Sequence, residues 1–193
     1  IWDTVHTLQF TGGEPIINKE HYDLLESIPT EVKRRINLRY ASNLSYIKFK
    51  QYDLIKIWNE FRSVNIKVSM DGVGDVYNYI RRDGDWDNVY NNMKVLNNEP
   101  TIDLAAGITI QAHNIFHMPE FYKFWNNSPI DLKFITANML QTPKYLSASL
   151  WHGEYRDAIM EKLGDAPEMV RFKTYMENNK PDYPLYVKMR KYT

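Results

Sequence analysis

The residues whose types and spacing best suit chemistry are Gly12, Gly13, Glu14 and Pro15, which follow an apolar run and precede a helix-like segment. Two adjacent glycines after a strand allow positive φ angles and a close approach of the backbone to a ligand, because no Cβ is in the way. The alternative is an ordinary strand-to-helix connection, in which Pro15 occupies the first helical turn and its missing N–H costs nothing.

Polar residues also stand at the ends of two later apolar runs. Ser42 and Asn43 follow one run, Ser69 and Asp71 close the next, and Arg81 comes after them. A serine hydroxyl can hydrogen-bond a ribose or a carboxylate, and an arginine can pair with a carboxylate through two N–H groups. The alternatives are an Asn43 turn that tolerates left-handed geometry, an Asp-Gly turn after residue 70, and a surface arginine.

Other chemical signatures are weak or missing. His113 and His117 have the spacing of a helical metal pair, but Asn114 and Met118 with its following proline predict a loop before a helix. The sequence contains no P-loop, no nucleophile elbow and no GxGxxG motif. It also contains no cysteine, which excludes disulfides, thiolate zinc sites and cysteine-ligated iron–sulfur clusters within these residues.

The elements that must position these residues alternate along the chain. Five strand-like runs and the helix-like runs between them recur about every 30 residues, the length of a βαβ unit, which predicts an α/β fold with a parallel sheet or barrel. The predicted strands are Thr7–Thr11, Ile36–Ser42, Ile66–Met70, Ile102–Gln111 and Leu132–Ala137. The predicted helices are Lys19–Ile28, Tyr52–Val64, one beginning near Trp86, Met118–Trp125, Trp151–Leu163 and Pro167–Asn178. We assign residues 1–150 to the barrel and 151–193 to a helical extension of the same domain.

Composition narrows the class of protein. The chain has 193 residues, of which 44% are hydrophobic, and its 24 basic and 24 acidic residues give no net charge. This favours one globular domain without a nucleic-acid partner. No run is long and apolar enough to span a bilayer, and no signal sequence is recognisable. We therefore expect a soluble, cytoplasmic protein without a membrane partner.

The order of the motifs resembles that of the radical S-adenosylmethionine (SAM) enzymes, over about residues 7–150. Gly12–Pro15 match the GGEP motif of their second strand, and Ser42 and Asn43 stand where many members have Thr-Asn-Gly. The best local match is Ser-Met-Asp-Gly at 69–72, Tyr-Ile-Arg at 79–81 and Trp-Asp-Asn-Val at 86–89 with Asn92. This series is similar to the branch related to SPASM and twitch-domain enzymes.

The resemblance implies an incomplete parallel (β/α)6 barrel, family strands 2 to 6, whose strand ends hold SAM. The SAM amino group would meet carbonyls and the carboxylate of Gly12–Pro15, since an ammonium needs acceptors. Arg81 would pair with the SAM carboxylate, and Ser69 with its ribose or carboxylate. Ile108 and Ile110 would pack beside adenine, although plain core residues would look the same. The backbone at Asn138, at the end of the sixth family strand, would meet the adenine edge. The residues assigned to SAM are Gly12, Gly13, Glu14, Pro15, Ser42, Asn43, Ser69, Asp71, Arg81, Ile108, Ile110 and Asn138; no catalytic or metal-binding residue is assigned.

The sequence departs from the family at its most reactive part. Members carry CxxxCxxC before GGEP, where three thiolates bind the [4Fe-4S] cluster that cleaves SAM to a 5′-deoxyadenosyl radical, and this chain has no such motif. Because the chain begins at Ile1 without methionine, we expect a fragment of such an enzyme, with an unknown small-molecule or peptide substrate. These 193 residues alone are expected to form no cluster and cleave no SAM.

Two other functions remain open at this stage. One is a natural cluster-less relative that binds SAM or another nucleotide, or serves as an interaction module. The other is an unrelated βα-type protein that binds a phosphorylated ligand. In either case the first strand, Thr7–Thr11, would lie at a sheet edge, so we expect it to be covered by the tail helices, by a second copy or by a separate chain.

Overall fold

The computed structural model describes residues 2–180, which form two compact units. The first unit comprises residues 2–70, 83–107 and 129–136. The second comprises residues 71–82, 108–128 and 137–180. Two strands, β6 (Ile102–Ile110) and β7 (Leu132–Met139), run from the first unit into the second. The predicted extension over residues 151–193 lies partly outside the described residues.

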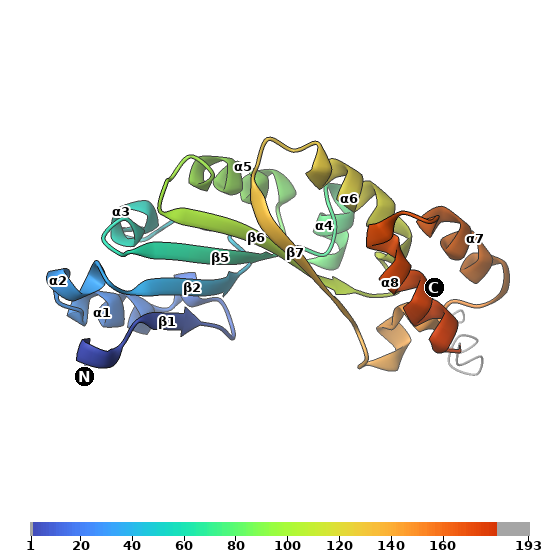
Figure 1. Ribbon diagram of the computed structural model, residues 1–193, viewed down its shortest axis with the longest axis horizontal. Helices are drawn as coiled ribbons and strands as arrows, with labels where there is room; N and C mark the ends of the chain where they lie inside the picture. Colours follow the sequence, from blue (N-terminus) through green and yellow to red (C-terminus); the bar gives the residue numbers. More distant parts are fainter. Residues whose placement is uncertain (1, 181–193) are drawn as a thin grey trace. The chain divides into compact units, whose positions relative to one another are not determined.

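A five-stranded sheet with the order β1-β2-β5-β6-β7 is the framework of the first unit (Figure 1). Strand β1 (Thr7–Phe10) pairs in parallel with β2 (Asn37–Ser42), β2 with β5 (Ser63–Ser69), and β5 with β6. The pairing confirms the predicted α/β class with a parallel sheet.

The two faces of this sheet differ in polarity because successive strand residues point to opposite sides. Leu38 and Tyr40 of β2 are buried, whereas Arg39 between them is exposed. The ring of Tyr40 lies 5.4 Å from that of Trp58 and 5.5 Å from that of His21, so helices cover this face. The opposite face carries the polar members of the strands.

The helices of the first unit begin at residues suited to capping. Helix α1 (Lys19–Ser27) follows Asn18, α3 (Leu54–Trp58) follows Asp53, and α5 (Trp86–Leu96) follows Asp85. Each of these side chains accepts a hydrogen bond from a backbone N–H of the first turn, which would otherwise lack a partner. Smaller elements complete the unit: 3₁₀ helices η1 (Trp2–Thr4) and η2 (Pro15–Ile17), helix α2 (Thr30–Lys33), and the antiparallel pair β3 (Lys48–Phe49) and β4 (Tyr52–Asp53).

One predicted helix is wrong in its bounds. The helix expected over Tyr52–Val64 is confined to α3, and β5 begins at Ser63 rather than at Ile66. The apolar spacing from residue 54 to 61 fits a helix, but residues 63–66 alternate in burial and pair in register with residues 37–40 of β2. Strand pairing therefore overrides the local helical pattern. A short helix in the second unit, α4 (Asp75–Ile80), was not predicted, and β7 extends to Met139 rather than ending at Ala137.

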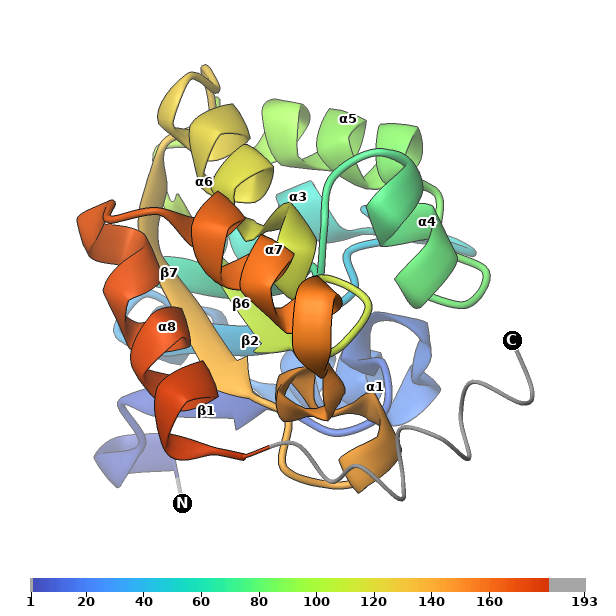
Figure 2. The same ribbon diagram turned by 90° about the vertical axis from the view of Figure 1, so that its right-hand side faces the viewer.

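The second unit is mainly helical. Besides α4 it contains α6 (Met118–Asn126), α7 (Gly153–Leu163), α8 (Pro167–Asn178) and the 3₁₀ helices η3 (Ile115–His117), η4 (Lys144–Leu146) and η5 (Ala148–Leu150). Helices α6, α7 and α8 contact one another and bury Phe121, Ile159 and Phe172 (Figure 2). Helix α7 ends at Leu163, where the predicted helix also ends, and Gly164 follows it at φ 59°. Within residues 2–180, no helix has the length and apolar character needed to cross a bilayer.

Strand β1 is an edge strand. Among the described residues its pairing partner is β2 on one side, and the sheet order places no strand on the other. An unpaired edge presents backbone donors and acceptors to any strand that can align with it. Self-association through this edge stays a prediction.

Candidate functional site

The glycine turn after β1 has the backbone conformation predicted for it. Gly12 and Gly13 have φ angles of 81° and 55°, in the region that favours glycine. A Cβ placed on either residue would meet no atom within 4 Å, so the left-handed backbone, rather than lack of space, requires glycine here. Pro15 then begins η2, the position at which its missing N–H costs nothing.

The Glu14 carboxylate joins this turn to the end of β2. Its Oε1 accepts hydrogen bonds from the Ser42 hydroxyl at 2.7 Å and the Ile16 N–H at 3.4 Å, and its Oε2 accepts one from the Asn43 N–H at 2.7 Å. A carboxylate offers about four acceptor positions, so most of its capacity is used within the chain. The structure thus brings together three residues, from two separate parts of the sequence, that were each predicted to bind SAM. Contact of this carboxylate with an ammonium group stays a prediction.

The loop after β2 is stabilised by hydrogen bonds from its backbone N–H groups to its own polar side chains. The Ser42 hydroxyl, 2% exposed, accepts from the Leu44 N–H at 2.9 Å, and Asn43 Oδ1 accepts from the Ser45 N–H at 2.9 Å. These contacts hold Leu44 at φ 54°, an unusual value for a branched residue. Ser42 and Asn43 therefore both stabilise this loop, a role that does not depend on a ligand.

Helix α5 supports the same loop through two asparagines. Asn92 Nδ2 donates to the Leu44 carbonyl at 3.0 Å, and Asn88 Nδ2 donates to the Ser45 carbonyl at 2.8 Å. Both asparagines belong to the motif recognised in the sequence, but no role was predicted for either. Their spacing of four residues, which places them on one side of a helix, was the available signal.

Ser69 ends β5, where it is half-buried and aligned with Gly107 of β6. The adjacent Met70 N–H donates to the Gly107 carbonyl at 2.9 Å, which extends the parallel pairing beyond the last strand residue. Ser69 thus lies at the carboxyl end of β5. Because β1, β2 and β5 are parallel, the carboxyl ends of β1 and β2 lie on the same side of the sheet. Ligands of open α/β sheets bind outside such strand ends.

In the second unit, Asp71 and Arg81 form a partly buried ion pair. Asp71 is 5% exposed, its Oδ2 lies 2.9 Å from Arg81 Nε, and its Oδ1 accepts the Thr109 N–H at 2.7 Å. Burial raises the pKa of the Asp71 carboxyl above its usual value, and the Arg81 charge opposes that rise. The pair engages Nε, whereas a guanidinium has five N–H groups, so pairing of Arg81 with a second carboxylate remains chemically available.

Asn114 connects the segment at Asp71 with the end of β6 through hydrogen bonds of its side chain. Its side chain is 0% exposed, and its Nδ2 donates to the carbonyls of Asp71 and Thr109 at 2.8 and 2.9 Å. Its Oδ1 accepts the Gln111 N–H at 2.8 Å. The sequence indicated only that Asn114 lies in a loop before a helix, because the Asp71 carbonyl that it binds is 43 residues away.

The remaining predicted residues are Ile108, Ile110 and Asn138, all in the second unit. Ile108 and Ile110 are 2% and 0% exposed, which a core position explains without any ligand. Asn138 is exposed on β7, and the preceding carbonyl, of Ala137, accepts a hydrogen bond from Arg171. Contact of these residues with adenine stays a prediction.

A buried histidine lies beside the glycine turn and was not predicted as part of the site. His21 is 5% exposed, its Nε2 lies 2.8 Å from the Tyr40 hydroxyl, and its Nδ1 is buried without a hydrogen-bond partner among residues 2–180. It lines a cavity of about 280 Å³ together with Gly12 and Pro15. Burial lowers the pKa of His21 from 6.5 to about 4, because the charged imidazolium is poorly solvated there.

This histidine is expected to make stability fall in acid. The folded pKa lies below the unfolded value, so the contribution of neutral His21 is complete above pH 6.5 and is lost as the pH falls toward about 4. After allowance for screening by water, we expect a loss of about 1 to 2 kcal/mol relative to a His21→Gln variant. Urea unfolding of both proteins between pH 7 and pH 4 measures it, and parallel curves for the two would contradict the assignment.

Comparison with solved structures places this geometry in a known fold. The chain is similar to anSMEcpe, an anaerobic sulfatase-maturating radical SAM enzyme, solved with bound AdoMet and Kp18Cys peptide, at 18% identity and a TM-score of 0.60. That match covers 91% of this chain and 49% of the other. The same protein with AdoMet and Cp18Cys peptide matches at 15% identity and a TM-score of 0.58, again over 91% of this chain and 49% of the other. SuiB from Streptococcus suis bound to S-adenosylmethionine matches at 16% identity and a TM-score of 0.52, over 71% of this chain and 31% of the other.

These likenesses lie in the fold rather than in the sequence. No protein-family model matches the chain, and no curated protein does. The chain spans about half or less of the length of the solved structures named above. The SPASM or twitch branch stays a prediction. The part of the chain that the structure describes has the partial-barrel α/β fold of solved radical SAM enzymes, as the order of its motifs predicted.

Proposed function

We propose that this chain is the SAM-binding part of a radical SAM enzyme, and that the glycine turn after β1 receives the amino group of SAM. The observation that carries the proposal is the Glu14–Ser42–Asn43 network, which holds two strand ends and a positive-φ glycine turn in one arrangement. The fold likeness to enzymes solved with AdoMet supports it.

The residues present are suited to binding SAM, but they do not suit the iron–sulfur cluster that reduces it. A Cβ built on Gly12 or Gly13 would meet no atom within 4 Å, so the space beside this turn is open to a ligand. Ser69 adds a hydroxyl at the carboxyl end of β5, on the same side of the sheet. When bound and reduced, SAM supplies a 5′-deoxyadenosyl radical. The reductant, a [4Fe-4S] cluster held by thiolates, does not fit this sequence, which contains no cysteine. The proposal for these residues is therefore to bind and orient SAM.

A peptide substrate forms part of the same proposal. Two of the similar structures were solved with bound AdoMet and a peptide, Cp18Cys in one and Kp18Cys in the other. The substrate of this chain would lie against the sheet whose strand ends hold SAM.

Titration calorimetry with SAM and with ADP tests the proposal. We expect saturable SAM binding that Gly13→Val weakens about tenfold or more, because a β-branched residue cannot adopt φ 55° without strain. The control is Gly164→Val, at the end of α7, which imposes a similar strain at φ 59° far from the turn in sequence. Tighter binding of ADP than of SAM would instead favour a protein for phosphorylated ligands.

A further inference from the structure

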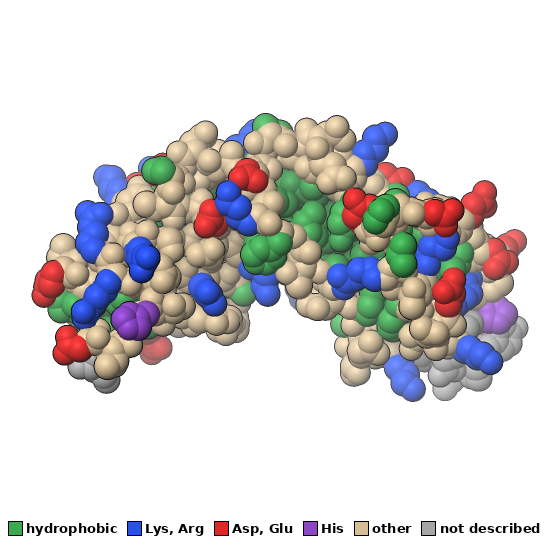
Figure 3. All heavy atoms as spheres, viewed as in Figure 1, with side chains coloured by type: hydrophobic (Ala, Val, Ile, Leu, Met, Phe, Trp, Pro, Cys, Tyr) green, Lys and Arg blue, Asp and Glu red, His purple; other side chains and the backbone are tan. Residues whose placement is uncertain are grey.

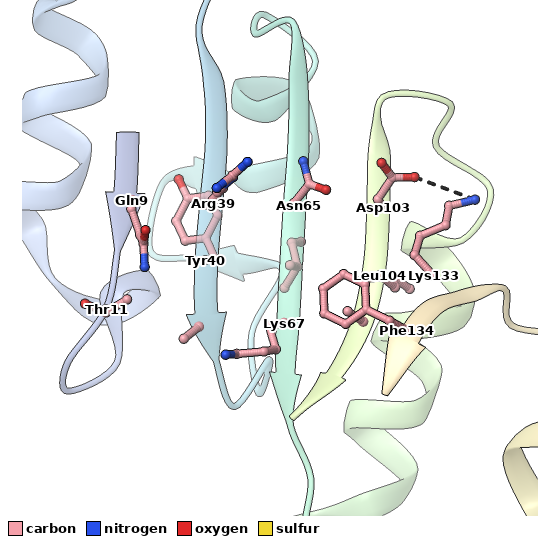
Figure 4. Close-up of a pocket in the computed structure, with 13 residues that line it drawn as sticks. Gln9, Thr11, Arg39, Tyr40, Asn65, Lys67, Asp103, Leu104, Lys133 and Phe134 are labelled. Atoms are coloured by element: carbon pink, nitrogen blue, oxygen red, sulfur yellow. Dashed lines mark ion pairs between the residues drawn. The ribbon is translucent and has the colours of Figure 1, made fainter. Parts of the chain in front are cut away.

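The polar face of the sheet in the first unit holds a cavity of about 370 Å³ (Figure 4). This volume lies toward the lower end of the range for ligand pockets, about 300–1,000 Å³. Its lining comes from β1, β2, β5, β6 and β7: Gln9, Thr11, Arg39, Tyr40, Ala41, Asn65, Ile66, Lys67, Asp103, Leu104, Ala105, Lys133 and Phe134. None of the residues assigned to SAM is among them.

The register of the strands places the polar side chains of this cavity in rows across the sheet. Gln9 aligns with Arg39, Arg39 with Asn65, and Asn65 with Asp103. Two residues further along, Lys67 stands between Ala41 and Ala105. Small neighbours on both sides leave room around the lysine, and Gly107 leaves room beyond it, since a Cβ there would lie 3.2 Å from Lys67 Cγ.

The charges of the cavity are unbalanced. It has three cationic side chains and one carboxylate, and that carboxylate, Asp103, has an oxygen 3.7 Å from Lys133 Nζ. Lys133 is also 2.7 Å from Asp131. Arg39 and Lys67 are exposed, and within residues 2–180 neither side chain makes an ion pair. Basic side chains, in blue, are visible over these strands in the space-filling view (Figure 3).

The two unpaired cations are close enough to act on one anion. They stand on neighbouring strands, offset by two residues, so their Cα atoms lie about 8 Å apart for a strand spacing of about 4.8 Å and a rise of about 3.3 Å per residue. Both side chains are long, and Figure 4 shows both projecting from the same face of the sheet. A carboxylate between them would gain charge-assisted hydrogen bonds from each.

We infer that this cavity takes a carboxylate side chain, Asp or Glu, of a peptide substrate through Arg39 and Lys67. Asn65, aligned with Arg39, supplies an amide for the peptide backbone, and Phe134, 56% exposed, supplies an apolar wall for a neighbouring side chain. The inference rests on the proposed function, from which the peptide comes. The carboxylate preference itself comes from the unbalanced charge.

NMR titration of the ¹⁵N-labelled protein with two capped peptides tests this inference. The probes are acetyl-Ala-Glu-Ala-amide and acetyl-Ala-Gln-Ala-amide, in which the glutamate side chain is the sole carboxylate. We expect the glutamate peptide to bind about tenfold more tightly, and Arg39→Gln or Lys67→Gln to remove that preference. Lys56→Gln, which removes an exposed charge from α3 outside the cavity, is the matched control and should retain the preference.

SAM titration of the same samples distinguishes failure of the carboxylate site from failure of the proposed SAM-binding function. If SAM binds but the two peptides bind equally, or neither binds, the carboxylate site is wrong while SAM binding stands. If the glutamate peptide is preferred but SAM does not bind, the proposed function is wrong, and with it the assignment of this ligand as the substrate. Inorganic phosphate that binds more tightly than the glutamate peptide, and loses affinity in the same two variants, would overturn a peptide as the occupant.

Discussion

Replacement of Asn114 by alanine is expected to lower the free energy of unfolding by about 3 kcal/mol. The substitution deletes three hydrogen bonds at once, to the carbonyls of Asp71 and Thr109 and from the Gln111 N–H. Because the side chain is 0% exposed, water has poor access to the groups left behind. The cost is mainly that of backbone groups buried without partners.

Asn127→Ala is the matched control in the same unit. That side chain is exposed, and the one hydrogen bond that it makes within residues 2–180, to the Lys123 carbonyl at 2.6 Å, can be replaced by water, so we expect a loss of about 0.5 kcal/mol or less. Chemical unfolding followed by circular dichroism measures both variants. Equal losses of unfolding free energy in the two variants would mean that solvent enters the Asn114 site, and that the Asn114 amide does not stabilise the segment at Asp71.

Glu14→Ala is expected to cost about 2.5 kcal/mol of stability and to weaken SAM binding about tenfold or more. The substitution removes the acceptor of the Ser42 hydroxyl and of the Asn43 N–H, both at 2.7 Å, so the glycine turn and the end of β2 lose their common partner. A turn that is free to change its φ angles no longer presents its carbonyls in one arrangement. Unfolding and SAM titration calorimetry, performed on the same preparation, measure the two effects.

Two further variants serve as controls for Glu14→Ala. Glu14→Gln keeps the size of the side chain but places an NH₂ group against a donor, so we expect it to resemble alanine. Glu26→Ala removes an exposed carboxylate from α1 outside the cavity beside the glycine turn, and should leave both measurements nearly unchanged. Loss of stability in Glu14→Ala with unchanged SAM affinity would separate the structural role of the carboxylate from the proposed binding role.

The parts of the fold that sequence reasoning predicted are those with a local cause. Gly12, Gly13 and Pro15 specify a turn by their own backbone preferences, and Gly164 ends a helix for the same reason. The two faces of β2 follow from the alternation of apolar and polar residues along it, because the period of two is a property of any strand. Such features need no knowledge of what lies far away along the chain.

The parts that were missed depend on distant partners. The extent of β5 is set by pairing with β2, which outweighs the helical spacing of the residues just before it. Asp71 and Arg81 were both chosen as SAM residues, yet their ion pair was not foreseen, since a motif records which residues occur and not which contact each other. The role of Asn114 depends in the same way on a carbonyl 43 residues away.

The row of Gln9, Arg39, Asn65 and Asp103 also bears on how such a protein can diversify. Each of the four comes from a different strand, and in each strand the neighbouring residues point to the opposite, helix-covered face. A substitution in the row therefore changes the ligand-facing surface without altering the packing beneath it. These four positions, spread over residues 9–103, can thus be exchanged one at a time while the same scaffold is inherited.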